Sequence, residues 1–281
     1  MDWTFYWFML PVCVCVASIA MFSGISGAAL LMPVFLFGFP LIGAPAMSTV
    51  SAIGMSLFLE TSGFGTGVHR YVRSRLVDWK TVSTLAIVTV PLGIMGAMLA
   101  KLAPVYLLRG MYGVVMIGLA VVLWRHRSSS DLDEALHRST RVVTTAAGAE
   151  YRYPVPRLSG QRVASGAGAF LAGLISTGVG EATLPGLIRR HRFPVPVAAA
   201  TTTVIVATTV VAAAATHLWE LIRNGGWGAI PWNLVTWAVP GAICGAVIGT
   251  HLQGRIPERT SQRFFSILFL AIGGLFVASI V

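Results

Sequence analysis

Two short glycine-containing stretches decide the fold of this chain. Residues 23–33 read Ser-Gly-Ile-Ser-Gly-Ala-Ala-Leu-Leu-Met-Pro, and residues 176–185 read Ser-Thr-Gly-Val-Gly-Glu-Ala-Thr-Leu-Pro. Glycine allows a helix to break or another backbone to approach closely. Such small residues also serve simple close packing of helices, which is the alternative interpretation. Because the stretches match in order and both end on a proline, we expect a helix break in each half of the chain.

The composition around these stretches is that of a membrane protein. Of the 281 residues, 56% are hydrophobic and 11% are charged, and the mean hydropathy is +0.78. A soluble domain carries about 25% charged residues. Apolar segments close to the roughly 20 residues that span a bilayer recur along the chain. We therefore expect an all-α polytopic protein embedded in a lipid bilayer, with the first segment retained rather than cleaved as a signal peptide.

The hydropathy pattern predicts ten helical segments and a central linker. The segments are 5–23, 26–40, 44–66, 77–100, 104–124, 161–176, 179–190, 196–219, 231–251 and 260–281. The polar stretch 126–160 contains Pro and Gly and indicates an extramembrane linker. We accordingly divide the chain into a first transmembrane repeat (1–125), the linker (126–160) and a second transmembrane repeat (161–281).

The two halves resemble each other beyond the glycine stretches. Ala46-Met-Ser-Thr49 is matched by Ala199-Ala-Thr-Thr202, and Pro91-Leu-Gly-Ile-Met-Gly96 is matched by Pro240-Gly-Ala-Ile-Cys-Gly245. Each half therefore has about five helical segments in the same order. A weak internal repeat of this kind is typical of secondary transporters, with the breaks near the membrane midplane.

The basic residues predict the orientation of the segments. All but Lys101, Arg109 and Arg223 lie in four clusters, around residues 70–80, 125–162, 189–192 and 255–263. An even number of predicted crossings separates successive clusters, so all four share one side, which the positive-inside rule makes cytoplasmic. The linker is then cytoplasmic, both termini face outward, and the two repeats have inverted topology. Whether segments 26–40 and 179–190 span the membrane fully or re-enter is left open.

Two carboxylates lie inside apolar segments, Glu60 and Glu181. Glu60 precedes Arg70 by ten residues and Glu181 precedes Arg189 by eight, which is about 12–15 Å at the helical rise. Both therefore lie near the middle of a hydrocarbon core of about 30 Å. Intramembrane carboxylates are costly and usually functional. We expect Glu181 and Glu60 to exchange protons, and the alternative for each is a buried acid hydrogen-bonded to neighbouring helices.

The breaks and nearby hydroxyls predict an anion site. A half-helix that begins at a break directs its free N–H groups and positive dipole end into the protein. Serine and threonine hydroxyls donate to oxyanions, although they often bond instead to a carbonyl one turn earlier. The expected substrate-binding residues are Ser26, Gly27, Ala28, Ser48, Thr49, Gly178, Gly180, Glu181, Ala182, Thr201 and Thr202.

These motifs resemble those of the sulfite exporter TauE/SafE family. Gly24-Ile-Ser-Gly-Ala-Ala-Leu-Leu-Met-Pro33 is similar to the family's GxGGGxxxxP signature and departs from it at Ser26 and Ala28. The run from Glu60 to Asp78 resembles an E-x-x-GF-x-x-G…YxRxxxxD segment. Thr177-Gly-Val-Gly-Glu181, Arg189-Arg-His-Arg-Phe-Pro194 and Ala198-Ala-Ala-Thr-Thr-Thr203 resemble one branch of the family. The resemblance covers nearly the whole chain outside 126–160.

The resemblance implies transport of sulfur-containing anions without ATP. We expect a secondary active transporter in the bacterial inner membrane that exports sulfite or organosulfonates, with proton coupling and a homodimer as the candidate assembly. The alternatives are a passive anion channel, a carrier of small carboxylates, and a membrane scaffold for a sulfur-metabolising enzyme. HExxH, GxSxG, P-loop and Cys/His metal motifs are absent from the sequence, so we expect no enzymatic activity, no metal, no other cofactor and no nucleic-acid partner.

Overall fold

The computed structural model describes residues 3–23, 25–124, 140–146, 148–252 and 258–280. Some residues that the sequence analysis used lie outside this part of the chain. Gly24 of the first glycine stretch, residues 125–139 of the linker, and Arg255 of the last basic cluster are not among the described residues.

The predicted helical segments all contain helices of the structure. These are α1 (Met9–Ser23), α2 (Gly27–Pro33), the π-helical turn η1 (Val34–Gly38), α3 (Phe39–Leu41), α4 (Thr49–Arg73), α5 (Trp79–Ala100), α6 (Val105–Trp124), α7 (Ser159–Ile175), α8 (Val179–Pro185), the π-helical turn η2 (Gly186–Arg190), α9 (Val195–Gly225), the 3-10 turn η3 (Trp227–Ala229), α10 (Trp232–Leu252) and α11 (Glu258–Ala278). Four of the described helices are long and apolar enough to cross a membrane: α5, α6, α9 and α10. The all-α polytopic prediction is confirmed.

Most elements differ from the prediction by a few residues at their ends, and segments 26–40 and 179–190 each contain a π-helical turn. The third segment begins at Thr49 rather than residue 44, because Ser48 caps it and its hydroxyl accepts a hydrogen bond from the Ser51 amide at 3.1 Å. Pro33 and Pro185 each precede a π-helical turn. Proline has no N–H to donate to the carbonyl four residues earlier, and the hydrogen-bond register changes just after it.

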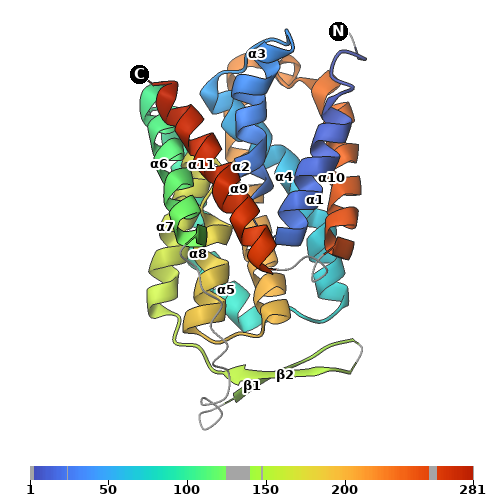
Figure 1. The fold of residues 1–281 in the computed structure, drawn as a ribbon, viewed down its shortest axis with the longest axis vertical. Helices are drawn as coiled ribbons and strands as arrows, with labels where there is room; N and C mark the ends of the chain where they lie inside the picture. The colour runs from blue at the N-terminus through green and yellow to red at the C-terminus, as the bar shows by residue number, and fades with distance from the viewer. Residues whose placement is uncertain (1–2, 24, 125–139, 147, 253–257, 281) are drawn as a thin grey trace.

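The breaks turn the chain back inside the molecule. In Figure 1, α1 runs from the N-terminal end into the interior and α2 returns toward that same end, while α7 enters from the opposite end and α8 returns toward it. Segments 26–40 and 179–190 therefore re-enter in the structure rather than span it. The two helical hairpins approach each other from opposite ends and meet in the middle of the bundle.

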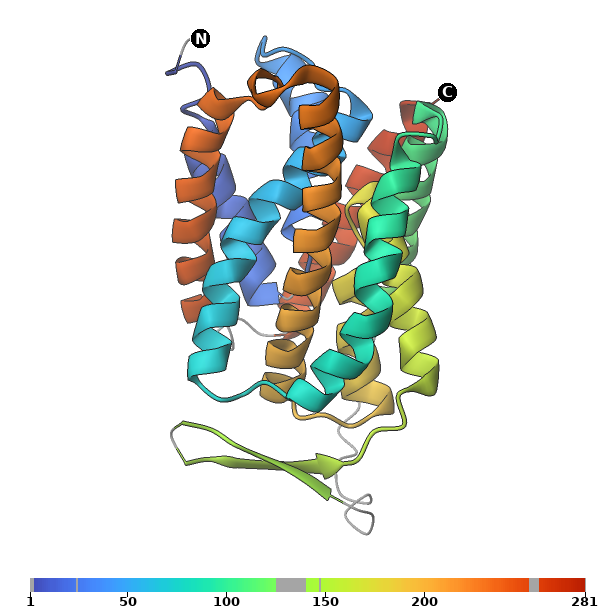
Figure 2. The same cartoon turned by 180° about the vertical axis from the view of Figure 1, so that it is seen from behind.

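Helix packing pairs elements of one half with elements of the other. α1 packs on α10 and α5 packs on α7; α6 packs on α11; and the long α4 and α9 cross at the centre, running in opposite directions (Figure 2). Two repeats related by a two-fold axis would produce this pairing. The inverted repeat itself stays a prediction.

Glycines allow the close packing of α5 on α7 and of α10 on α1. A Cβ on Gly96 would lie 2.1 Å from the Phe170 carbonyl oxygen, and one on Gly173 would lie 2.0 Å from the Gly93 carbonyl oxygen. On the other side of the bundle, a Cβ on Gly245 would lie 2.4 Å from the Val14 carbonyl oxygen. Backbones in contact are typical of membrane helices with small residues at their interface.

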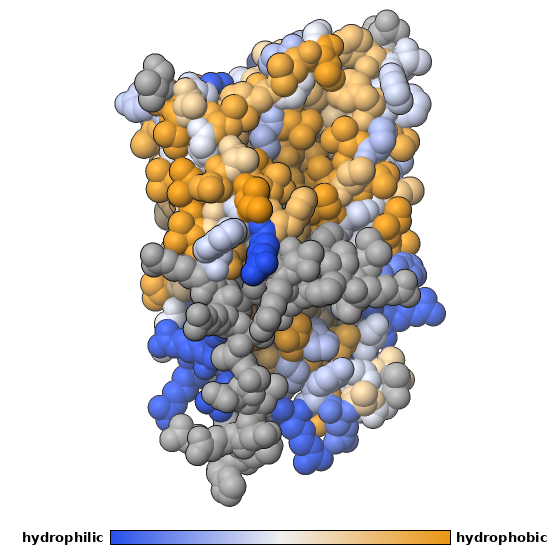
Figure 3. Space-filling model, in the orientation of Figure 1, coloured by the Kyte–Doolittle hydropathy of each residue, from blue (hydrophilic) through white to orange (hydrophobic). Residues whose placement is uncertain are grey.

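The linker contains a β-hairpin that the sequence analysis did not predict. Strands β1 (Thr140–Thr144) and β2 (Glu150–Pro154) pair antiparallel with Thr140 opposite Pro154. The hairpin lies across one end of the bundle, at the opposite end from both termini (Figures 1 and 2). Hydrophilic side chains gather near this end in the view of Figure 3, and apolar ones predominate among the coloured residues toward the opposite end. Both ends of the described chain thus lie opposite the linker, as the charge clusters predicted.

A buried carboxylate attaches the hairpin to the bundle. Asp78, 4% exposed, pairs with Arg141 of β1 and accepts hydrogen bonds from Tyr153 of β2 at 2.9 Å and from the Thr81 hydroxyl at 2.9 Å. Burial alone would raise the pKa of Asp78. The hydrogen bonds from Arg141, Thr81 and Tyr153 and the charge of Arg141 outweigh burial, so the pKa lies below its ordinary value.

The glycine contacts predict that the effect of a Gly→Ala substitution on stability depends strongly on its position. Gly96→Ala should lower the free energy of unfolding by about 1–3 kcal/mol, because its new methyl group meets the backbone of α7. Gly118→Ala is the matched control: nothing lies within 4 Å of a Cβ there, and alanine gains up to about 1 kcal/mol in helix propensity. Thermal unfolding in detergent measures both, and equal melting temperatures for the two variants would contradict the packing.

The hydrogen bonds of Asp78 predict that the hairpin detaches from the bundle at acidic pH. A lowered pKa in the folded state stabilises the docked hairpin above the ordinary aspartate pKa of about 3.9, and this stabilisation is lost as pH falls through the lowered value. Hydrogen exchange of residues 140–154 should therefore stay slow at neutral pH and accelerate only below about pH 4. Asp78→Asn should accelerate exchange at pH 7. Glu150→Gln, which breaks only an exposed pair with Arg152, should have little effect.

Candidate functional site

The two helix breaks meet at the centre of the bundle. Ser26 is the residue before α2, and its hydroxyl lies 3.3 Å from the carbonyl oxygen of Ser176, which follows α7. Both serines are buried. The contact joins residues 150 positions apart, so the site exists only when both halves are assembled.

Backbone conformation explains why the second break needs glycine. Ser176 and Gly178 have positive φ angles of 61° and 128°. The value at Gly178 lies where side chains are strongly disfavoured. A Cβ on Gly178 would also lie 2.9 Å from the carbonyl oxygen of Gly168 on α7. Glycine at this position thus allows α8 to turn back directly against α7.

Glu181 connects the two breaks. It lies in the first turn of α8, and its Oε2 accepts a hydrogen bond from the Gly178 amide at 3.1 Å, which is half of a capping box. Its Oε1 accepts one from the Ser26 amide at 3.0 Å. One carboxylate therefore satisfies amides from both breaks.

Glu60 reaches the first break from α4. Its Oε1 accepts a hydrogen bond from the Ser26 hydroxyl at 2.8 Å, and the backbone amides of Gly27 and Ala28, at the start of α2, lie beside this carboxylate. Glu60 is 5% exposed. Its Oε2 has no hydrogen-bond partner among the described residues. The positive end of α2 thus faces a buried carboxylate with spare acceptor capacity.

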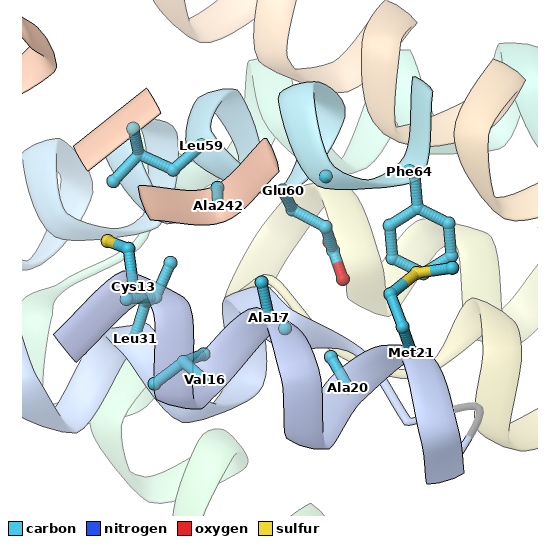
Figure 4. A pocket seen from close by; sticks show the side chains of 12 residues that line it. Cys13, Val16, Ala17, Ala20, Met21, Leu31, Leu59, Glu60, Phe64 and Ala242 are labelled. Carbon is cyan, nitrogen blue, oxygen red and sulfur yellow. The ribbon is translucent and has the colours of Figure 1, made fainter. Parts of the chain in front are cut away.

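The pocket around Glu60 is otherwise apolar. It lies between α1, α2, α4 and α10 and is lined by Ala17, Ala20, Leu59 and Phe64, among others. Figure 4 shows the Glu60 carboxyl group directed from α4 toward Ala17 and Ala20 of α1. A charge in such surroundings depends for its stability on the few amides and the hydroxyl that it contacts.

The structure brings together only some of the predicted binding residues. Ser26, Gly27, Ala28, Gly178, Glu181 and the proton-exchange candidate Glu60 form one cluster, which we call the break site. Gly180 lies buried in the first turn of α8, beside the cluster. The Ala182 amide donates to the Gly178 carbonyl within α8 at 3.0 Å, so this amide is not free for a substrate in this conformation.

The predicted hydroxyls lie elsewhere. Ser48 caps α4, and Thr49 accepts a hydrogen bond from Nε of Arg109 at 3.2 Å. Thr49 is eleven residues before Glu60 on the same helix, a separation of about 16 Å. Thr201 accepts a hydrogen bond from the Asp78 amide at 3.0 Å. Thr202 is buried, and its hydroxyl has no partner among the described residues. The structure does not place these four residues in the break site, and their role in binding stays a prediction.

Three residues that border the break site were not among the predicted binding residues. Ser176 contacts Ser26, and the Thr177 hydroxyl is buried with no partner in the described part of the chain. Tyr112 of α6 is fully buried and donates to the Ala29 carbonyl in the first turn of α2. The position of Ser176 and Thr177 inside the second glycine stretch was the available signal. An apolar helix with a single central tyrosine gives a weaker signal for Tyr112.

Metal ligands do not gather in the described part of the chain, where no group of three His, Cys, Asp or Glu side chains is placed to hold an ion. What the break site offers is backbone and hydroxyl donors facing two carboxylates. Such donors bind oxyanions, and the carboxylates bind or release protons.

Comparison with known proteins identifies the family. The model of the family described as "Sulfite exporter TauE/SafE" matches residues 9–276. "Probable membrane transporter protein YunE" of Bacillus subtilis (strain 168) is 23% identical over 222 residues, which cover 79% of this chain and 78% of that protein. A "Probable membrane transporter protein" of Xylella fastidiosa (strain 9a5c) is 34% identical over 112 residues, covering 38% of this chain and 40% of that protein. No solved structure matches the chain.

The geometry predicts that Glu181 stabilises the fold through both of its oxygens. Glu181→Gln keeps the shape but replaces one acceptor by an NH₂ group, which leaves one amide of a break unsatisfied. The free energy of unfolding should fall by about 1–3 kcal/mol. Glu220→Gln, at an ion pair with Lys101 near the bundle surface, should change it much less. Thermal unfolding in detergent distinguishes them, and a Glu181→Gln melting temperature equal to the wild type would contradict this geometry.

Proposed function

We propose that this chain, which belongs to the sulfite exporter TauE/SafE family, is a secondary active exporter of small sulfur-containing anions such as sulfite or organosulfonates. Membership of the family makes the protein a membrane transporter. The class of substrate, the direction and the coupling to protons are the proposal. The observation that supports it is that two of the protein's own carboxyl groups, those of Glu60 and Glu181, occupy the break site.

A substrate anion is proposed to take the place of a carboxylate. The amides of Ser26, Gly27 and Ala28 and the Ser26 hydroxyl are already arranged around carboxylate oxygens. A sulfite or sulfonate group also presents oxygens that accept such hydrogen bonds. When Glu60 or Glu181 withdraws, the same donors are free for the substrate. An apolar pocket lies beside Glu60, and it is the space toward which the side chain is proposed to withdraw.

Displacement of a glutamate carboxylate by the substrate gives a physical reason for proton coupling. Two carboxylates and a substrate anion together would place three negative charges in an apolar interior, which is costly. A proton on the displaced carboxylate removes one of these charges and also removes its ability to accept the amide hydrogen bonds. Substrate binding is then linked to proton uptake at Glu60 or Glu181, and substrate release is linked to proton release.

The membrane arrangement is part of the proposal. We place the linker on the cytoplasmic side of the bacterial inner membrane, because the described basic residues at the ends of α4 and η2 lie near the hairpin end. Two inverted repeats with the break site between them suit alternating access from the two sides. The interior-negative potential then favours outward movement of anions. A homodimer is the assembly we propose.

A carrier of small carboxylates is the second candidate. The same observation favours it, because the donors of the break site hold carboxylates in the structure. A passive anion channel would use the same donors without a cycle of protonation. Flux in the presence of lactate and acetate as competitors separates the substrate classes, and single-channel currents separate a channel from a carrier.

The proposal predicts that each glutamate controls the pH dependence of transport. In proteoliposomes, uptake of radiolabelled sulfite by the wild type should change severalfold with an imposed pH gradient. Glu60→Gln and Glu181→Gln should reduce the flux at least tenfold, or abolish its response to the gradient, whereas Glu220→Gln should retain both. Sulfite flux that keeps its full pH response in both site variants would remove the coupling. If the protein transports a carboxylate and does not transport sulfite, small carboxylates replace sulfur-containing anions as the substrate class.

A further inference from the structure

A second cavity lies beside the Glu60 pocket. Its walls include Tyr71 of α4, Leu184 of α8, and Thr202 and Thr203 of α9. It shares Ala20, Met21 and Phe64 with the Glu60 pocket. The two cavities are thus adjacent spaces with a common wall. We call the second one the Thr202 cavity.

Thr202 lines this cavity and carries a hydroxyl without a partner in the described part of the chain. Thr202 is 4% exposed, and its Oγ1 has no hydrogen-bond partner among the described residues. Its neighbours on the chain are engaged, since Thr201 accepts from the Asp78 amide and Thr203 donates to the Ala199 carbonyl at 2.8 Å. A buried hydroxyl left without a partner is costly. The Thr202 Oγ1–H is therefore available to donate to an oxyanion in the cavity.

Two flexible side chains separate the cavities. Met21 and Phe64 are both nearly buried and lie next to each other between α1 and α4 (Figure 4). The Met21 methyl group fills the space above Gly67, since a Cβ on Gly67 would lie 2.3 Å from Cε of Met21. Methionine is unbranched and adapts to gaps of irregular shape. Rotation of its side chain changes the wall between the cavities without movement of a helix.

Positive charge lies on the side of the Thr202 cavity. Tyr71 in its wall is followed by Arg73 at the end of α4, and Leu184 precedes Arg189 and Arg190 at the end of η2. These ends face the hairpin side of the bundle. Acidic residues are absent from the described lining of the cavity. Basic residues on this side of the bundle attract anions and raise their local concentration there.

We propose that the Thr202 cavity is a second binding site for the small oxyanion, on the hairpin side, and that Met21 and Phe64 form the gate between it and the break site. The inference rests on the proposed anion transport for its ligand. The position of the gate does not rest on it. The substrate stays bound at Thr202 while Glu60 occupies the hydrogen-bond donors of the break site. It moves on to the break site when the Met21 side chain rotates.

Thiol labelling tests the gate without a measurement of transport. Cys13 is a native reporter, because it is 1% exposed and lines the Glu60 pocket. The exposed Cys15 and Cys244 are replaced by alanine. In a second protein, Cys13 is also replaced and Thr202→Cys supplies the reporter. The probe is methanethiosulfonate ethylsulfonate, a small sulfonate anion, added to membranes with the hairpin side accessible.

The gate predicts three labelling rates. Thr202→Cys should react at least tenfold faster than Cys13. Met21→Ala should raise the rate at Cys13 about tenfold or more, and Gly67→Ala should change this rate too, because its methyl group displaces Met21. Gly65→Ala is the matched control, since nothing lies within 4 Å of a Cβ there. Equal rates at Thr202→Cys and Cys13, or a Cys13 rate that Met21→Ala leaves unchanged, would overturn the gate.

Transport kinetics test the binding site. Thr202→Val removes the hydroxyl and keeps the shape, and it should raise the KM for sulfite about tenfold, as expected for one hydrogen bond to a charged group. Thr208→Val is the control, because the Thr208 hydroxyl bonds only to carbonyls of its own helix in the described structure. A KM that both variants leave unchanged would overturn the binding site. Normal labelling rates in a protein without sulfite flux would instead count against the proposed function.

Discussion

Backbone amides at the two helix breaks must find acceptors inside an apolar bundle, and this constraint shapes the rest of the structure. In a membrane interior no water is at hand to satisfy an exposed N–H group. Glu181 accepts from amides of both breaks, and Glu60 accepts from the Ser26 hydroxyl and lies beside the first turn of α2. The carboxylates and the breaks therefore stabilise each other. Neither would be stable at this depth alone, because an unpaired charge and an unpaired amide are both costly there.

Close helix packing supplies the geometry that brings the breaks together. α1 and α7 each end at a break, and each is held by a helix of the other half, α10 and α5. Glycines such as Gly96 and Gly245 allow these pairs to touch backbone to backbone. The contact between Ser26 and Ser176 is the result. A site assembled in this way responds to any shift between the two halves, which is the movement that alternating access requires.

The carboxylates are not related by the internal repeat. The alignment that matches Thr49 with Thr202 places Ala213, a buried residue of α9, opposite Glu60. Likewise, Pro33 and Pro185 close the two glycine stretches, so Ala29 corresponds to Glu181. The first break therefore contacts both carboxylates, and the amide of the second break contacts Glu181. The break site is asymmetric.

The sequence predicted the breaks and the two intramembrane carboxylates because glycine pattern, proline position and burial cost are local properties. It did not predict that the carboxylates bond to the amides of the breaks, since the direction of Glu60 depends on how α4 packs against α2. The helical rise already places Thr49 about 16 Å from Glu60, so their separation was foreseeable. The hairpin was missed because its strands lie in a polar stretch and depend on Asp78, distant in sequence, for attachment.

Displacement of a carboxylate by the substrate is the central claim, and proton uptake on binding tests it most directly. Isothermal titration of the detergent-purified protein with an organosulfonate whose charge is constant from pH 5 to 8, in buffers of different ionisation enthalpy, gives the number of protons taken up. Displacement predicts uptake approaching one proton per bound anion in the wild type and a marked reduction in Glu60→Gln or Glu181→Gln. Binding of the sulfonate to the wild type with no proton uptake at any pH in this range would contradict the account.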